Sequence, residues 1–380
     1  MTKHINPFKI LALAALIVLP ALSRATGNED GPEKIKTISK SYTVGPTEKL
    51  KIENSFGDVV INTWDKNEFK IDIEMYAKAT SDERAQYMLD HMKVTDSRSD
   101  NVVRFKTDVN INSNKNNDGD DDKDDDGDDD KDDKDKKDNH KHNNNGNHQQ
   151  FHVNYVVYMP ATNPLDINNQ FGKTTVPDFK GVVNLTSGFG KLTAGRLENV
   201  EKIDVQFGGV TIEGMQNGKA ILGFDTKPNS YINIVGGNVK INSDYSHHVQ
   251  FNVSSNIKDL SINESFSTVN LVVAKDLSAN FSMHTSFGSL HNYTDFKIAE
   301  INDDDDDSRG PKFDKDYSGK AGEGAANIKI KSSFGNVRIS HTALSGDEEE
   351  KERAEKKERK ERKERKEKKE QKETKESEES

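Results

Sequence analysis

The side chains best suited to chemistry in this chain are carboxylates and imidazoles gathered in one stretch. Asp122-x-Asp124-x-Asp126-Gly127 has the spacing of the first half of a calcium-binding loop, and Asp133 stands at its twelfth position. The twelfth ligand of such loops is usually a bidentate Glu, and an Asp-rich run reproduces the spacing by composition alone. The pattern therefore predicts weakly bound calcium, and a solvated acidic loop is the alternative.

Two histidines extend this stretch. His140-x-His142 has the spacing of a weak chelate for zinc, copper or nickel. The alternative is that both are ordinary polar residues of a disordered insert. The segment from Asp118 to Asp138 holds 14 Asp and 5 Lys, a local charge of −9 in a chain whose net charge is −11. Because residues 113–150 contain no apolar side chain, they cannot bury enough surface to offset the entropy of ordering. We therefore expect this Asp/Asn/His-rich insert to be disordered.

The sequence holds no recognisable catalytic motif. It has no Cys, which excludes disulfides, thiolate metal sites and a cysteine nucleophile. Gly188-Phe189-Gly190 begins like a dinucleotide-binding loop, but we expect strands and no helix around it. An enzyme would need polar residues that converge on one face of the fold, and the candidates are Asp225, Asp244, His247 and His248. We predict no enzymatic activity, no catalytic residues, no cofactor beyond that calcium, and no nucleic-acid partner, which would require a basic face.

The N-terminus has the pattern of a secretory signal peptide over residues 1–25. Lys3 and Lys9 accompany the apolar run Ile10–Leu19, and Ser23-Arg24-Ala25 places small residues at the −3 and −1 positions of a cleavage site. The run is too short to span a bilayer, and an uncleaved anchor is the alternative. We expect an exported protein, in the periplasm, at the cell surface or secreted, with no transmembrane segment after cleavage.

Residues 34–112 predict an N-terminal β section with one helix. Apolar and polar residues alternate, as in half-buried strands, over residues 36–44, 49–52, 59–64, 69–73 and 102–111. Residues 81–92 predict a helix with Ser81 as its N-cap and one apolar stripe, formed by Ala85, Met88, Leu89 and Met92. Strands 102–111 and 151–159 flank the insert, and we interpret them as a hairpin with a greatly lengthened connection.

A repeated motif occupies residues 151–341, and one copy precedes them. Each copy is a Phe followed by Gly or Ser, between two alternating strands. The corner residues are Phe56, Gly57, Phe171, Gly172, Phe189, Gly190, Phe207, Gly208, Phe266, Phe287, Gly288, Phe334 and Gly335. Gly236 takes the Phe position in a degenerate copy. The spacing of 18 residues between Phe171, Phe189 and Phe207 is typical of a solenoid, whose units bury their apolar faces by stacking.

We therefore predict an all-β, single-chain β-solenoid or β-roll, and a sandwich with Phe-Gly hairpin turns is the alternative. In the solenoid, Gly would supply the positive φ of each corner. Phe would point inward and stack on the Phe of neighbouring coils. A carbohydrate-binding aromatic platform is a further interpretation of these Phe residues, although such platforms usually expose Trp or Tyr and the only Trp is Trp64.

Residues 345–380 form a Lys/Glu-rich C-terminal segment. Pairs such as Glu358–Arg362 and Glu361–Arg365 have the favourable i,i+4 order of an isolated helix. No apolar seam is present, which excludes a coiled coil. The sequence predicts a charged helical or disordered tail.

The order of these features resembles the bacterial putative-adhesin domains of unknown function. The resemblance is carried by Val59-Val60-Ile61-Asn62-Thr63-Trp64, the helix at 81–92, Met159-Pro160 and the serial Phe-Gly corners, over residues 36–112 and 151–340. It implies a β-solenoid-like fold and an envelope or surface location, with no catalytic residues to carry over. The insert and the charged tail depart from the family pattern.

Together these observations predict a non-enzymatic exported envelope protein, an adhesin or interaction scaffold whose partner is a surface polymer or protein of unknown identity. The alternative is a periplasmic protein that binds or senses divalent cations through the Asp/His-rich insert.

Overall fold

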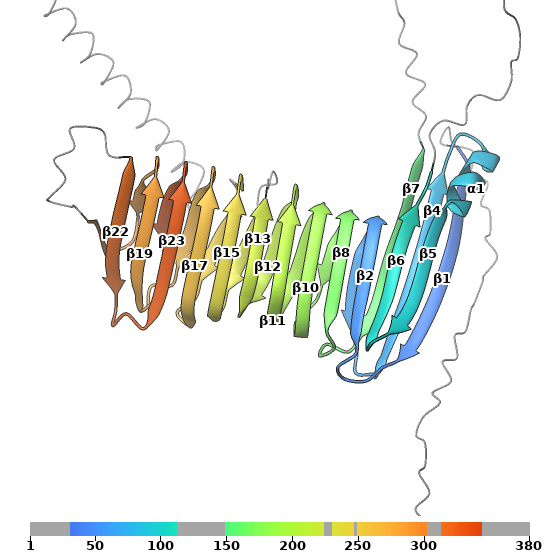
Figure 1. Cartoon of the computed structure of the whole chain (residues 1–380), viewed down its shortest axis with the longest axis horizontal. Helices are drawn as coiled ribbons and strands as arrows, with labels where there is room; N and C mark the ends of the chain where they lie inside the picture. The colour runs from blue at the N-terminus through green and yellow to red at the C-terminus, as the bar shows by residue number, and fades with distance from the viewer. Residues whose placement is uncertain (1–30, 112–148, 224–229, 247–248, 302–312, 344–380) are drawn as a thin grey trace, which may run out of the picture.

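The computed structural model describes residues 31–111, 149–223, 230–246, 249–301 and 313–343. These residues are nearly all β, and they form 24 strands and one helix. The strands lie side by side along the longest axis of the molecule, from β22 at one end to β1 and α1 at the other (Figure 1). The strands form one hydrogen-bonded sheet. The sheet consists of two rows of strands, and β11 takes part in both. Its first part pairs with β9 and β12, and its last part pairs with β10 and β13.

The two rows follow from the strand pairings. The first row contains, in spatial order, β5 (Met92–Ser99), β6 (Val102–Val109), β2 (Lys49–Phe56), β8 (Leu165–Phe171), β10 (Phe179–Phe189), the end of β11 (Lys191–Gln206), β13 (Gly218–Gly223), β15 (Gly237–Asp244), β17 (Ile257–Ser265), β23 (Ala326–Ser333), β19 (Ala279–Ser286), β22 (Asp314–Ala321) and β21 (Lys297–Glu300). The second row contains β1 (Glu33–Thr43), β4 (Glu68–Lys78), β7 (Gln150–Met159), β3 (Val59–Thr63), β9 (Thr174–Val176), the start of β11, β12 (Gly209–Met215), β14 (Ser230–Ile234), β16 (Val249–Val253), β18 (Thr268–Val273), β24 (Asn336–Ser340) and β20 (Leu290–Asn292).

Most strands pair in parallel, and alternation of side chains builds the core. In β2, Leu50 and Ile52 are buried while Lys51 and Glu53 face outward, and the same alternation recurs along both rows. The buried side chains form one hydrophobic cluster. The antiparallel pairs lie at the ends of the rows. They join β1, β4 and β7 in the second row and β5 and β6 in the first row at the N-terminal end, and β19, β22 and β21 at the other end.

The helix α1 (Asp82–Asp90) contacts β1, β4 and β5 at the N-terminal end of the rows. The hydroxyl of Ser81 accepts a hydrogen bond from the amide of Arg84 at 3.1 Å, and Ala85, Met88 and Leu89 are buried. Met92, which the sequence pattern included in the helix, begins β5. Among the described residues, no helix has the length and apolar content that crossing a membrane would require.

The hairpin expected around the insert is wrong. β6 pairs with β2 and β5, whereas β7 pairs with β3 and β4 in the other row. The insert therefore lies in the sequence between a strand of the first row and a strand of the second. Alternation within each strand could not reveal this, because it does not specify which strands become partners.

The corner aromatic residues face outward, so the prediction of an inward-facing Phe is wrong. Six of the corner Phe residues have exposed fractions between 42% for Phe266 and 56% for Phe287, and Phe56 is half-buried. Strand alternation alone would turn each Phe inward, because the residue two positions earlier is buried. At Phe207, Phe266, Phe287 and Phe334 the backbone is left-handed, with φ between 48° and 60°, which interrupts the alternation and directs the ring outward.

Stacking between corner rings does occur, and among the described residues the rings form two runs, which we call the aromatic columns. In the first, Phe56, Phe171, Phe189 and Phe207 stack with centroids 4.8–5.1 Å apart. In the second, ring centroids are 4.8–4.9 Å apart, and the order is Tyr245, Phe266, Phe334, Phe287 and Phe313. Tyr245 takes the aromatic place that the sequence pattern gave to Gly236, which lies instead before β15 at the opposite end of that strand.

The corner glycines have two different roles. Gly57 and Gly172 adopt positive φ values of 122° and 144°, as expected from the sequence. At later corners the requirement is space: a Cβ on Gly190 would lie 1.9 Å from the carbonyl oxygen of Gly172, and one on Gly208 would lie 1.8 Å from that of Gly190. Successive corner backbones therefore touch at their glycines.

Candidate functional site

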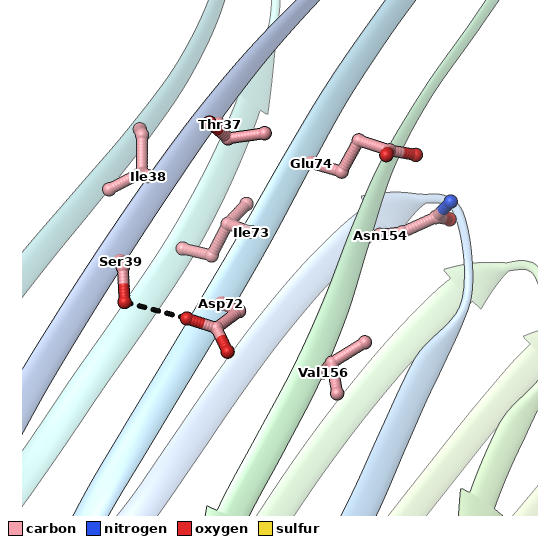
Figure 2. Close-up of a pocket in the computed structure, with 8 residues that line it drawn as sticks. All are labelled: Thr37, Ile38, Ser39, Asp72, Ile73, Glu74, Asn154 and Val156. Atoms are coloured by element: carbon pink, nitrogen blue, oxygen red, sulfur yellow. Dashed lines mark hydrogen bonds between the residues drawn. The ribbon is translucent and has the colours of Figure 1, made fainter. Parts of the chain in front are cut away.

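A groove crosses the outward face of β1, β4 and β7 near the N-terminal end of the rows (Figure 2). Its volume is about 510 Å³, within the usual range of ligand pockets, roughly 300–1,000 Å³. The lining residues are Thr37, Ile38, Ser39, Asp72, Ile73, Glu74, Asn154 and Val156. The groove combines carboxylates, an amide and hydroxyls with apolar side chains.

Strand register brings these side chains together from distant parts of the sequence. Ser39 of β1 is opposite Asp72 of β4, and Thr37 is opposite Glu74. On the other side of β4, Glu74 is opposite Asn154 of β7. Because alternate residues of a strand share a face, the polar side chains form a continuous outward surface.

Hydrogen bonds and ion pairs position the groove carboxylates. Ser39 Oγ donates to Asp72 Oδ1 at 2.6 Å (Figure 2), and Lys70 Nζ lies 2.8 Å from Asp72 Oδ2. The hydrogen bond to Asp72 raises the pKa of Lys70. Glu74 is more open, with His152 Nε2 3.8 Å from its carboxylate. The groove thus offers oxygen acceptors, which suit a ligand rich in hydroxyl or amide donors.

A polar side chain lies beneath several corners, two residues before the aromatic ring. Asn54 Nδ2 donates to the carbonyl oxygen of Gly57 at 3.2 Å, and Asn169 Nδ2 donates to that of Lys173 at 3.2 Å. Both side chains are buried. They satisfy carbonyl groups at the corners, so their role is structural.

Glu264 occupies the same position before Phe266, and its side chain is only 4% exposed. Its carboxylate accepts hydrogen bonds from the backbone amide of Ser267 and the hydroxyl of Ser332. Burial raises the pKa of Glu264 to about 7, the two hydrogen bonds oppose that rise, and Asp244 adds to it. Sequence analysis missed this carboxylate, although its place two residues before a corner Phe was a usable signal.

A Ser–His–Asp arrangement lies on the outward face of β19 and β22. His284 Nδ1 is 2.9 Å from Asp316 Oδ1, and Ser286 Oγ is 3.3 Å from His284 Nε2. However, Ser286 Oγ donates to Asp314 Oδ1 at 2.5 Å. Its single hydrogen is therefore directed to Asp314, and His284 is not placed to remove it. This arrangement has the geometry of a surface polar network.

The predicted metal-site residues Asp122, Asp124, Asp126, Asp133, His140 and His142 lie outside the described residues, as do residues 1–25 and the tail at 345–380. Of the four residues considered for an enzyme, only Asp244 is described, and it is exposed at the end of β15. Within the described ranges, no group of three or more His, Asp or Glu side chains is arranged to hold a metal ion.

The aromatic columns do not have the geometry of a carbohydrate platform. A sugar stacks on the face of an aromatic ring, but neighbouring rings in the columns are almost parallel, with interplanar angles of 2–8° at most contacts. Each ring face is covered by the next ring. The exposed parts are ring edges, which form a narrow apolar ridge.

Comparisons with known proteins find likeness in solved structures alone. No protein-family model and no curated protein matches the chain. A structure titled as a putative adhesin from Bacteroides fragilis is 11% identical, with a TM-score of 0.34, over 80% of this chain and 97% of its own. One titled as a putative cell adhesion protein from Clostridium sporogenes is 10% identical, with a TM-score of 0.22, over 81% of this chain and 99% of its own.

Proposed function

We propose that this chain is an exported, non-enzymatic interaction scaffold, an adhesin-like protein built as a β-solenoid, and that the groove over β1, β4 and β7 is its binding site. The stacked parallel units and the corner contacts between Gly172, Gly190 and Gly208 support the solenoid. The signal-peptide pattern of residues 1–25 supports export.

The observation that carries the proposal is the composition of the groove on a rigid surface. Asp72, Glu74 and Asn154 present acceptors from two paired strands, beside the apolar side chain of Val156. Ser39 Oγ donates to Asp72, whose other oxygen is paired with Lys70, so that carboxylate is already engaged. Such a surface can bind a ligand through hydrogen bonds and apolar contact without changing it chemically, and glycans carry donors of this kind.

An array of immobilised oligosaccharides tests this proposal. The mature protein is compared with Asp72→Asn/Glu74→Gln and with a matched control, Asp204→Asn/Glu213→Gln. Asp204 is paired with Lys202 as Asp72 is with Lys70, and Glu213 is exposed as Glu74 is. We expect at least one glycan to bind the wild type and the control, with about tenfold weaker binding to the groove variant, equivalent to ~1.4 kcal/mol. Equal binding by all three proteins, or binding by none, would overturn the proposal.

A further inference from the structure

The outward face of the first row carries lysines that lack the acidic neighbours found elsewhere in the molecule. On β2 and β11 of the first row, an outward lysine is followed two residues later by a carboxylate that pairs with it. Lys51 Nζ lies 3.2 Å from Glu53, and Lys202 Nζ lies 2.7 Å from Asp204. Alternate residues share one face of a strand, so this spacing neutralises each lysine locally.

In the following strands the partner position is no longer acidic. Lys219 is followed by Ile221, and Lys240 is followed by Asn242. Lys329 of β23 is followed by a further lysine, Lys331. Among the described residues, no ion pair is found for Lys219, Lys240, Lys329 or Lys331.

Strand register places these lysines in one line across the face. Lys219 of β13 is opposite Lys240 of β15. Lys240 is opposite Ser261 of β17, which in turn is opposite Lys329. Lys202 precedes Ile203, the residue opposite Ala220, and so it extends the line beyond Lys219. We call Lys219, Lys240 and Lys329 the lysine column; Lys202, which is paired with Asp204, lies at its edge.

Such a column is unfavourable in the isolated protein. Like charges directly opposite on neighbouring strands destabilise a sheet. Neighbouring strands lie about 4.8 Å apart, so the three lysines span roughly 14 Å, with Ser261 in the one gap. Asp244 lies at the end of β15 and Asp259 near the start of β17, and Asp204 is paired with Lys202. Among the described residues, no carboxylate therefore stands in register with Lys219, Lys240 and Lys329.

A hollow continues the column toward the C-terminal end. It has a volume of about 400 Å³, and its lining includes Lys329, Lys331 and His284 beside Asp316. Lys331 is opposite His284 on β19. The face therefore combines a line of cationic side chains with a recess at one end that could hold a bulky anionic group.

We propose that the lysine column binds a linear anionic polysaccharide laid across the strands. The distance between neighbouring strands is comparable with the length of one pyranose residue, so successive acidic sugars can meet successive lysines. Because the column and the groove over β1, β4 and β7 lie on different rows, this inference goes beyond the proposed function and does not require the groove to bind anything.

The test uses the mature full chain and polygalacturonate, a carboxylated polymer, with dextran sulfate as a sulfated one and neutral dextran as the uncharged control. Lys219→Gln/Lys240→Gln/Lys329→Gln removes three cations of the column. Lys36→Gln/Lys93→Gln/Lys275→Gln removes three exposed lysines elsewhere and makes the same change in net charge. Binding is measured by co-sedimentation or calorimetry at low and high salt.

We expect the wild type and the control variant to bind at least one of the two anionic polymers, more weakly as salt is added. The column variant should bind about tenfold or more weakly than the control, and neutral dextran should bind to none. If the column variant loses binding to polygalacturonate, the column recognises carboxylate groups; if it loses binding to dextran sulfate, the column recognises sulfate groups. Equal loss in both variants, or equal binding of duplex DNA that the column variant also loses, would overturn the proposal in favour of general charge attraction. The groove variant Asp72→Asn/Glu74→Gln should still bind the anionic polymer. Failure of this proposal can therefore be distinguished from failure of the proposed function.

Discussion

Phe266 and Phe334 stack with their ring centroids 4.8 Å apart and their planes 2° from parallel. β17 and β23 precede these rings and pair in parallel, although β19 lies between them in the sequence. β23 is inserted between β17 and β19, so the last unit of the chain is not the last unit in space. The rings therefore stack in the spatial order of the strands β17, β23 and β19, and their contacts stabilise that order.

Removal of Phe334 should weaken this end of the molecule. Phe334 contacts Phe266 on one side and Phe287 on the other, and Phe334→Ala loses both contacts. Aromatic pairs contribute about 0.5–1.5 kcal/mol each, so we expect a loss of roughly 1–2 kcal/mol because the ring is half exposed. Urea denaturation measures the change. Phe334→Leu, which keeps apolar contact, should lose less; equal losses would contradict a role for ring stacking.

The glycine contacts between corners predict that a Gly→Ala substitution destabilises the protein strongly at a corner and little at an open site. Gly208→Ala places a Cβ 1.8 Å from the Gly190 carbonyl oxygen, so the two units must separate. We expect it to lower the free energy of unfolding by more than about 2 kcal/mol. Gly45 has no atom within 4 Å of such a Cβ, so Gly45→Ala serves as the control and should change stability little. Similar unfolding midpoints for both variants would contradict the close packing of the corners.

Glu264 predicts a pH dependence of stability. The pKa of its folded state, about 7, is above its ordinary value of 4.5. Between these values the unfolded chain is ionised while the folded chain keeps the proton, so stability falls as pH rises from about 4.5 to 7 and levels off above. The total loss should be on the order of 1–3 kcal/mol.

The variant Glu264→Gln should remove this component. Gln keeps the shape of the side chain and cannot ionise, so its thermal unfolding midpoint should depend less on pH and exceed that of the wild type at pH 8. Glu213→Gln, which alters an exposed carboxylate, is the control and should retain the wild-type dependence. A wild-type protein whose stability did not fall between pH 5 and 8 would refute the assignment.

Alternation and repetition in the sequence were sufficient to predict a nearly all-β chain, but they placed one corner at Gly236, whereas Tyr245 supplies the stacked ring. The direction of the Phe rings was not predictable by these means, because it depends on left-handed backbone at residues such as Phe207 and Phe334, where no glycine signals it. The hairpin across the insert was wrong because alternation does not encode strand partners. The groove was missed because Ser39, Asp72 and Asn154 meet only through the register of three strands.

The acidic insert supplies a test of the cation-binding alternative. If the chain acts as a scaffold, calcium and zinc titrations of the mature protein should give only millimolar association that added salt suppresses. A variant lacking residues 114–150 is the comparison. Micromolar binding that disappears with the deletion would instead make divalent-cation binding the leading function.

Binding without chemical change is the central claim, and co-sedimentation with a panel of insoluble polysaccharides tests it most directly. The mature protein is incubated with each polymer, the bound fraction is measured, and the chain length of the polymer is determined before and after. We expect at least one polymer to retain the protein, and we expect the chain length of that polymer to stay unchanged. Shortening of the polymer, or retention by none of the panel, would contradict it.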